Sequence, residues 1–262
     1  MAITVAADGT LLVLDQINRR VQRWKDGKLV GSMPFGGDTV QDVVAGPEGR
    51  TVLLDRLADR NLQIYDPTGK LLNEVSLVGK GVPEGGGVTA VFADDNGVYV
   101  EREHGAVVRI ADVNGHPDPA RPELIGRPSR DGKLLLSAAL ADRGAGTVSL
   151  RAFDRKTSQP VWSTVVSLGA PILHVITLDS DTQGAVYLAA STGAETTTAP
   201  FHVVDEAIVV TRLTGGQQRG LLTLPPFATA DETFRPITVA DDGTLYVEYV
   251  GENGVEVRRY RF

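Results

Sequence analysis

Residues 3–35 decide the fold of this chain, and they read ITVAADGTLLVLDQINRRVQRWKDGKLVGSMPF. The stretch contains four short runs of strand-forming residues, Ile3–Ala6, Thr10–Leu14, Val21–Trp24 and Lys28–Met33. Asp8-Gly9 separates the first two runs and Asp26-Gly27 separates the last two. An Asp-Gly pair accepts the positive φ angles of a tight hairpin turn. We therefore predict four antiparallel strands joined in a meander.

The same succession of runs and turns recurs along the chain, in six copies altogether. The copies occupy about 3–38, 39–87, 88–125, 126–170, 171–225 and 235–262. Each has a glycine in its first turn, at Gly9, Gly49, Gly97, Gly132, Gly184 and Gly243. A four-stranded repeat of about 40–50 residues is typical of a propeller blade. The sequence therefore predicts an all-β fold, a six-bladed β-propeller with four-stranded blades, as a single domain over residues 1–262. No stretch shows sustained helical periodicity, so we expect almost no helix.

The last copy contains only three runs, because the sequence ends at Phe262. Nothing before Ile3 offers a spare strand that would complete it. Either a terminal strand is missing from this sequence, or the last blade has three strands. We favour the missing strand. In both cases we expect an unpaired strand edge, which is a liability for a sheet protein.

The segment Val13–Trp24 resembles the NHL-repeat consensus, in which a strand ending in Val-x-Asp precedes a loop with Asn and Arg and then a second alternating strand. The second copy keeps part of this pattern, with Leu54-Asp55 and Asp59-Arg60, and the last copy keeps only its first strand and turn. The middle copies keep only the turn. The resemblance implies an NHL-like six-bladed propeller, and such propellers more often bind proteins or ligands than catalyse reactions.

Composition and motifs argue against several kinds of function. The net charge of −7 argues against nucleic acid as the main partner, since phosphate binding needs a concentrated basic surface. The absence of cysteine excludes disulfides, thiolate catalysis and cysteine-based zinc sites. The sequence has no window of about 18 apolar residues, so we predict no transmembrane helix. Residues 1–20 do not resemble a signal peptide. We find no nucleophile elbow, phosphate-binding loop or dinucleotide fingerprint, and predict no cofactor.

The most conspicuous polar group is Asp15 with Asn18 and Arg20. We interpret it as architecture, in which Asp15 accepts hydrogen bonds from its own loop and pairs with Arg20. The second copy repeats these residue types with Asp55 and Arg60, so we expect the same pairing there.

Metal sites are not predicted. Asp179–Gly184 carries two carboxylates on a tight turn, but Ala190 stands where a calcium loop would need a glutamate. The histidines lack metal-binding spacing; they are His104, His116, His174 and His202. The inner strands consist mostly of Ile, Val, Thr, Ala and Leu, which predicts an apolar or small-residue lining. We assign no catalytic residue.

Loop length is the most informative functional signal. Three long connections, Gly79–Gly87, Ala190–Glu206 and Pro225–Arg235, fall on one end of the predicted propeller, its top face. Long loops in a compact domain are usually functional or disordered. They carry the candidate binding residues, Phe201, His202, Phe227, Phe234 and Glu195, with a further acidic rim of Asp205, Glu206, Asp231 and Glu232. Aromatic residues with an acidic rim suit a partner of basic character. Alternatively, these aromatics pack onto the blade edges as local cores.

We therefore expect a non-catalytic binding or scaffold protein, monomeric, that recognises a protein, peptide or glycan through its top face. The alternative is a propeller hydrolase or lyase that uses a metal or a histidine in the central channel. The compartment stays open, with an extracytoplasmic location favoured. Arginine outnumbers lysine, which is typical of GC-rich bacterial genomes.

Overall fold

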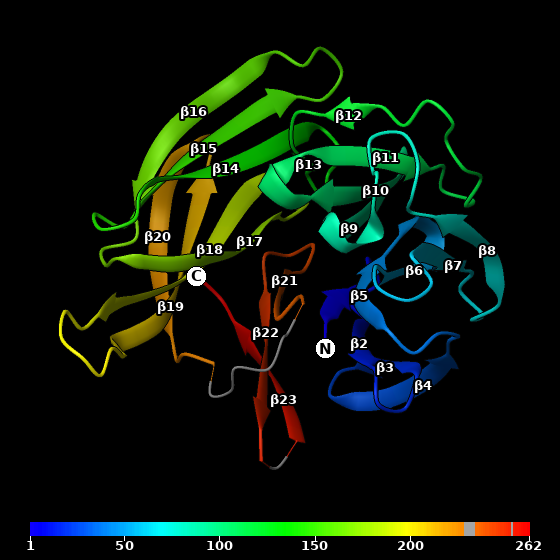
Figure 1. The fold of residues 1–262 in the computed structure, drawn as a ribbon, viewed down its shortest axis with the longest axis horizontal. Coiled ribbons are helices and arrows are strands. Elements are labelled where there is room, and N and C mark those ends of the chain that lie inside the picture. Colours follow the sequence, from blue (N-terminus) through cyan, green and yellow to red (C-terminus); the bar gives the residue numbers. More distant parts are fainter. Residues whose placement is uncertain (228–233, 253) are drawn as a thin grey trace. The chain divides into compact units, whose positions relative to one another are not determined.

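The computed structural model describes residues 1–227, 234–252 and 254–262. In these ranges the chain is almost entirely β, and its strands form six antiparallel sheets (Figure 1). Five sheets have four strands and the last has three. This confirms the prediction of six blades in an all-β fold. Helical structure in the described ranges is limited to 3-10 turns at Pro47–Gly49, Gly85–Gly87 and Glu103–Gly105.

Two compact units divide the chain. Unit 1 comprises Met1–Pro128 and Glu232–Ala240, and unit 2 comprises Ser129–Asp231 and Asp241–Phe262. The expectation of one domain over residues 1–262 stays a prediction.

The first three sheets each contain consecutive strands. The first sheet contains β1 (Ile3–Val5), β2 (Leu11–Asp15), β3 (Arg20–Lys25) and β4 (Lys28–Pro34). The second contains β5 (Val40–Ala45), β6 (Thr51–Asp55), β7 (Asn61–Tyr65) and β8 (Leu71–Ser76). The third contains β9 (Val88–Asp94), β10 (Gly97–Arg102), β11 (Val107–Ala111) and β12 (Glu123–Leu124).

The other three sheets follow the same order. The fourth contains β13 (Arg127–Pro128), β14 (Leu134–Asp142), β15 (Thr147–Asp154) and β16 (Pro160–Ser167). The fifth contains β17 (Ile172–Ser180), β18 (Ala185–Glu195), β19 (Val203–Thr214) and β20 (Gln217–Leu224). The sixth contains β21 (Ile237–Val239), β22 (Leu245–Gly251) and β23 (Gly254–Tyr260).

The turn glycines have the backbone conformation that the sequence predicts. All six have positive φ angles, which only glycine adopts without strain; they are Gly9, Gly49, Gly97, Gly132, Gly184 and Gly243. A short side chain often completes the turn. In the first one, Asp8 Oδ1 accepts a 2.9 Å hydrogen bond from the backbone amide of Thr10. These turns therefore fix where each inner strand ends and the next begins.

Single strands supply side chains to two hydrophobic clusters. On β6, Val52 and Leu54 belong to the cluster that joins the second and third sheets. Leu53, between them, belongs to the cluster that joins the first and second sheets. Successive side chains of a strand point to opposite faces, so a sheet with both faces apolar packs against a neighbour on each side. In unit 2 a third cluster joins the fourth and fifth sheets through residues such as Leu150 and Leu188.

In the third sheet the fourth strand, β12, is only two residues long. The structure corrects the predicted elements at one place. The segment 190–206, expected to be a long loop, is instead a continuation of strands β18 and β19. The two strands pair as far as Glu195 and Val203, so residues 196–202 form the tip of a longer hairpin.

Candidate functional site

The five predicted binding residues do not form one group. Glu195, Phe201 and His202 lie on the β18–β19 hairpin, and Phe227 lies after β20. Phe234 belongs to unit 1, whereas the other four belong to unit 2. Of the predicted acidic rim, Asp205 and Glu206 lie on the hairpin, whereas Asp231 and Glu232 lie outside the described residues.

Phe234 is part of a core. It is half-buried and packs against both hydrophobic clusters of unit 1, and the Arg56 guanidinium lies 4.8 Å from its ring centroid. Its backbone amide donates a 2.8 Å hydrogen bond to the carbonyl of Met1. Phe234 therefore anchors the N-terminal segment, which is the local-core alternative left open by the sequence.

Phe227 is also engaged within the fold. Its ring centroid lies 5.8 Å from that of Tyr249, and the Arg258 guanidinium lies 4.6 Å from the Tyr249 ring. Burial, and then the neighbouring Tyr260, raise the pKa of the Tyr249 hydroxyl well above its usual value. Phe227 is thus one side of a small aromatic cluster, not an exposed contact residue.

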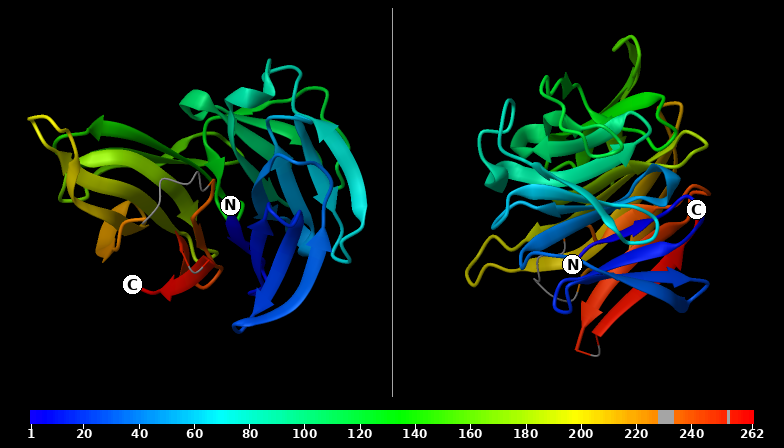
Figure 2. Two further views of the ribbon diagram at one scale, coloured as in Figure 1. Left: turned by 60° about the horizontal axis from the view of Figure 1, so that its bottom comes forward. Right: turned by 90° about the vertical axis from the view of Figure 1, so that its right-hand side faces the viewer.

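The remaining three residues lie on a two-stranded projection, which we call the hairpin arm, residues 194–206. Strand β17 last pairs with β18 at Thr192, and β20 last pairs with β19 at Ile208. Beyond those points β18 and β19 pair only with each other, up to the pair Glu195 and Val203. Figure 2 shows this part of the hairpin in yellow, extending past the other strands of its sheet.

Backbone packing and local hydrogen bonds hold the tip of the arm. Gly193 stands at its base, where an added Cβ would come within 2.8 Å of a Val203 methyl group. At the tip, the Thr196 amide donates to the His202 carbonyl at 2.9 Å, and the His202 amide donates to Thr196 Oγ1 at 3.0 Å. The His202 ring Nδ1 lies 3.0 Å from the Pro200 carbonyl. The ring is therefore held by its own turn.

The arm exposes apolar and acidic side chains together. Phe201 is 74% exposed at the tip, and Val203 and Val204 beside it are 38% and 37% exposed. Glu195 and Glu206 on the same arm are also exposed. An exposed aromatic residue with apolar neighbours and a rim of carboxylates is chemically suited to hold a partner that offers both an apolar side chain and a positive charge.

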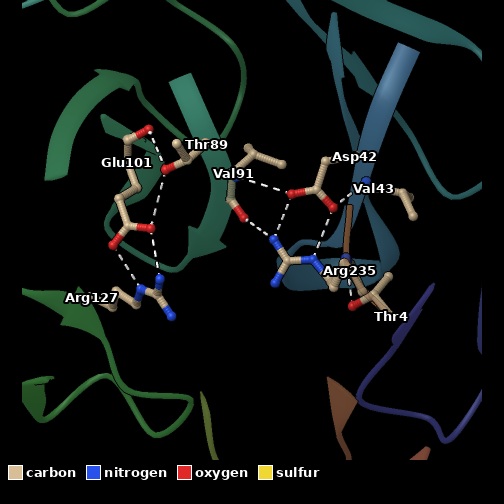
Figure 3. A network of polar contacts seen from close by, with 9 residues as sticks. Thr4, Asp42, Val43, Thr89, Val91, Glu101, Arg127 and Arg235 are labelled. Carbon is tan, nitrogen blue, oxygen red and sulfur yellow. Dashed lines mark hydrogen bonds and ion pairs between the residues drawn. The ribbon is translucent and has the colours of Figure 1, made fainter. Parts of the chain in front are cut away.

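A second polar arrangement, which the sequence reasoning missed, lies on the inner strands of unit 1 (Figure 3). Asp42 on β5 is completely buried. Arg235 binds it with two hydrogen bonds, Nε to Oδ1 at 2.9 Å and Nη2 to Oδ2 at 2.7 Å. Asp42 also accepts from the amides of Val43 and Val91, and Arg235 donates to the Val91 carbonyl at 2.6 Å. One ion pair thus links three segments that are distant in sequence.

A second ion pair lies beside the first. Glu101 on β10 accepts two hydrogen bonds from Arg127, at 2.8 and 2.7 Å. The guanidinium groups of Arg127 and Arg235 lie 5.5 and 5.6 Å from the ring centroid of Phe92, a distance at which cations are attracted to the ring. The prediction of an apolar or small-residue inner lining is therefore wrong at Asp42. A lone aspartate inside the apolar run of β5 was the available signal.

These inner ion pairs are architecture. Each carboxylate is neutralised by a guanidinium in bidentate geometry, which is the strong form of this interaction. Neither is left as a nucleophile or a base. Removing either partner would leave a buried charge, so the pairs fix the positions of the strands that carry them.

The Asp15 loop has the predicted structural role. Asp15 accepts from the Asn18 amide at 3.2 Å, from Arg20 Nε at 2.8 Å and from Gln22 at 3.1 Å. Burial raises the pKa of the Asp15 carboxyl, but these hydrogen bonds outweigh it and hold the pKa below its ordinary value.

The second copy of this loop differs from its expected form. Asp55 accepts from Thr39 Oγ1 at 2.8 Å and from the amides of Leu57 and Ala58. Arg60 instead donates to the Leu57 carbonyl. The prediction of an Asp55–Arg60 pair is therefore wrong, because the Asp55 carboxylate instead accepts a hydrogen bond from Thr39, in the connection before β5.

The remaining candidate ligands are dispersed. In the Asp179–Gly184 turn, Asp181 accepts from the Gln183 and Ala185 amides and from the Tyr187 hydroxyl. His116 Nδ1 lies 2.8 Å from Asp112, and His174 is exposed on β17. Among the described residues, no group of three or more His, Cys, Asp or Glu side chains is placed to hold a metal ion. Within the same residues no helix is long and apolar enough to cross a membrane.

Glu248 is a further buried carboxylate, not predicted from the sequence. It lies in the middle of β22 and is completely buried. Neither of its carboxylate oxygens has a hydrogen-bond partner among the described residues. Burial raises the pKa of this carboxyl to about 7.

Comparison with known proteins identifies the fold and leaves the family open. No protein-family model matches the chain, and no curated protein matches it. The NHL resemblance therefore stays a prediction.

Solved structures resemble the chain over nearly its whole length. The hydrazine synthase of Kuenenia stuttgartiensis matches with a TM-score of 0.61 at 14% identity, covering 98% of this chain and 75% of that one. A chain of the mitotic checkpoint complex matches with a TM-score of 0.56 at 13% identity, covering 100% and 86%. U3-55K matches with a TM-score of 0.52 at 12% identity, covering 94% and 72%. With its six sheets, the protein is a β-propeller.

Proposed function

We propose that this propeller is a non-catalytic binding module whose hairpin arm docks onto a protein partner. The exposed Phe201 at the tip of the arm carries the proposal, because an aromatic residue that is 74% exposed leaves most of its apolar surface available to a partner. Buried aromatic anchors supply much of the energy of protein interfaces. One solved structure of similar fold, a chain of the mitotic checkpoint complex, is part of a protein assembly.

Charge specifies the partner further. The chain has a net charge of −7, and Glu195, Asp205 and Glu206 on the arm are all exposed. A partner with an apolar pocket bordered by lysine or arginine would bury Phe201 and pair with these carboxylates. Charge complementarity of this kind mainly raises the association rate and excludes acidic partners.

The test uses peptide arrays in which apolar residues alternate with Lys, with Glu or with Ser. We expect the wild-type chain to select the lysine peptides, and Phe201→Ser to weaken their binding by about 30-fold, as for an aromatic hot spot. Fluorescence anisotropy with a labelled lysine peptide would measure the change.

Ile17→Ser is the matched control, because Ile17 is 92% exposed but lies in unit 1, away from the arm in the sequence. It should bind as the wild type does. Equal binding of the glutamate peptides, or a Phe201→Ser variant that binds like the wild type, would refute the proposal.

A further inference from the structure

Strand β16 differs from the other outer strands. Each sheet ends on an outer strand, and five of the six outer strands carry at least one charged residue. These charged residues are Lys28 on β4, Glu74 on β8, Glu123 on β12, Arg219 on β20, and Glu256, Arg258 and Arg259 on β23. Strand β16, with the sequence PVWSTVVS, has none. Charges on an edge strand are the usual protection against pairing with another chain.

One side of the β16 backbone is free to pair. The strand pairs with β15 from Ser167 back to Trp162, and again at Pro160 after a register shift that leaves Val161 without a partner on β15. It is the last strand of its sheet. At its last residue, the Ser167 carbonyl accepts a 3.2 Å hydrogen bond from Gln218 Nε2 on β20; for Pro160–Val166, no backbone hydrogen bond to a segment other than β15 is found among the described residues. An edge of eight residues is long enough to accept a further strand.

The two faces of β16 have different surroundings. Trp162 is half-buried and packs beneath the β19–β20 turn, where an added Cβ on Gly216 would lie 3.1 Å from the indole. Val166 is buried in the cluster of the fourth and fifth sheets. On the opposite face Val161 and Val165 are 53% and 61% exposed, and Ser163 between them is also exposed.

We propose that β16 pairs with β16 of a second copy of this chain, in antiparallel orientation about a two-fold axis at Ser163. In this register Val161 of one copy lies opposite Val165 of the other, twice by symmetry, and Ser163 lies opposite itself. Both exposed valines thereby gain an apolar cross-strand neighbour.

A second copy fits this edge better than a foreign peptide. The uncharged strand offers no charge by which to select a partner, whereas its valines are symmetric about Ser163 and therefore self-complementary. A two-fold pair has the same patch on both partners, which is the commonest symmetry of soluble oligomers. The sequence led us to expect a monomer; the edge of β16 points to a dimer. A single strand pair buries little area, so the dimer is weak.

Sedimentation velocity from about 10 µM to 1 mM should show the wild-type chain shifting from monomer to dimer. Ser163→Lys places two ammonium groups opposite each other on the axis, and we expect the dissociation constant to rise by about tenfold or more. Ser163→Glu should do the same. An equimolar mixture of the two variants should restore the dimer, because lysine then faces glutamate.

Ser32→Lys is the control, since Ser32 is an exposed serine on the outer strand β4 and should leave the dimer unchanged. The absence of cysteine allows a direct check of the register. Ser163→Cys should give a covalent dimer under mild oxidation, and Ser32→Cys should not. A wild-type chain that stays monomeric to 1 mM, a dimer indifferent to Ser163→Lys, or a mixture that stays monomeric would overturn the proposal.

Discussion

Two buried carboxylates show how much a single residue depends on its neighbours. Asp42 and Glu248 both lie within strands and are both fully buried. Arg235 and two backbone amides satisfy Asp42, whereas the oxygens of Glu248 have no hydrogen-bond partner among the described residues. Burying a charge without a partner is costly, so burial raises the pKa of the Glu248 carboxyl and pushes it towards its neutral form.

Asp42→Ala should destabilise the protein by about 3–5 kcal/mol, because it leaves the Arg235 guanidinium largely buried without its carboxylate. Urea denaturation of the full chain would measure the change. Asp38→Ala is the control, since the Arg19–Asp38 pair is 60% and 69% exposed and should change stability by less than about 1 kcal/mol. The double change Asp42→Leu with Arg235→Met should recover much of the loss. A cost for Asp42→Ala no larger than that for Asp38→Ala would contradict the role of the pair.

Glu248 makes stability depend on pH. Its pKa is about 7 in the folded protein against 4.5 for the ordinary group, so the folded state binds the proton more tightly than the unfolded state. This contribution is fully favourable below pH 4.5 and is lost as the pH rises through about 7. The full loss corresponds to roughly 3 kcal/mol.

Glu248→Gln should remove this dependence. Relative to the variant, the wild type should lose stability between about pH 4.5 and pH 7 and then level off, as measured by urea denaturation at each pH. The exposed residue Glu195 provides the control, because Glu195→Gln should leave the wild-type pH profile intact. Parallel profiles for the wild type and Glu248→Gln would show that the carboxyl is not buried in solution.

At the scale of the element, similar turns differ in what surrounds them. Gly9 and Gly243 occupy the first turn of the first and last sheets with nearly the same φ angles, 82° and 79°. An added Cβ at Gly9 would meet nothing within 4 Å, whereas at Gly243 it would lie 2.5 Å from the Tyr187 hydroxyl. Tyr187 cannot easily move away, because it is 2% exposed and donates to Asp181 at 2.9 Å.

Gly9→Ala should therefore cost only the strain of a left-handed backbone, about 1–2 kcal/mol. Gly243→Ala should cost that strain and in addition the overpacking against Tyr187, for a total of roughly 3–4 kcal/mol. Thermal and urea unfolding of both variants would compare them. Because the backbone term is shared, equal costs at the two positions would mean that the Tyr187 contact is absent.

Strand length explains where the functional features lie. Most strands end at turns that the sequence marks with glycine, but β18 and β19 continue beyond their neighbours and form the hairpin arm. The exposed edge of β16 is likewise a property of a whole strand, since it depends on eight consecutive residues without charge. The arm and the β16 edge belong to the same unit.

For the whole molecule, the repeat explains the fold and the exceptions to the repeat suggest the function. Among the described residues, five of the six sheets contribute apolar residues to three clusters, which join the first and second, the second and third, and the fourth and fifth sheets. The net charge of −7 belongs to the whole surface and favours a basic partner over an acidic one. The residues proposed to bind a partner lie on the hairpin arm, beyond the four-stranded part of its sheet.

The sequence alone determined the strand order, the six turns and the class of fold. These follow from glycine and aspartate at turns and from alternation of apolar residues, which are local properties of the backbone and of side-chain direction. It also predicted the Asp15 loop, whose hydrogen bonds join residues only a few positions apart.

Only the tertiary structure decided which aromatics are exposed and which carboxylates are paired. Phe201 and Phe234 are both phenylalanines in segments expected to be loops, yet one is exposed at a hairpin tip and the other packs in a core. Asp42 and Arg235 are 193 residues apart. Burial and ion pairing depend on what the folded chain brings alongside a residue, and contacts over such separations leave no local pattern in the sequence.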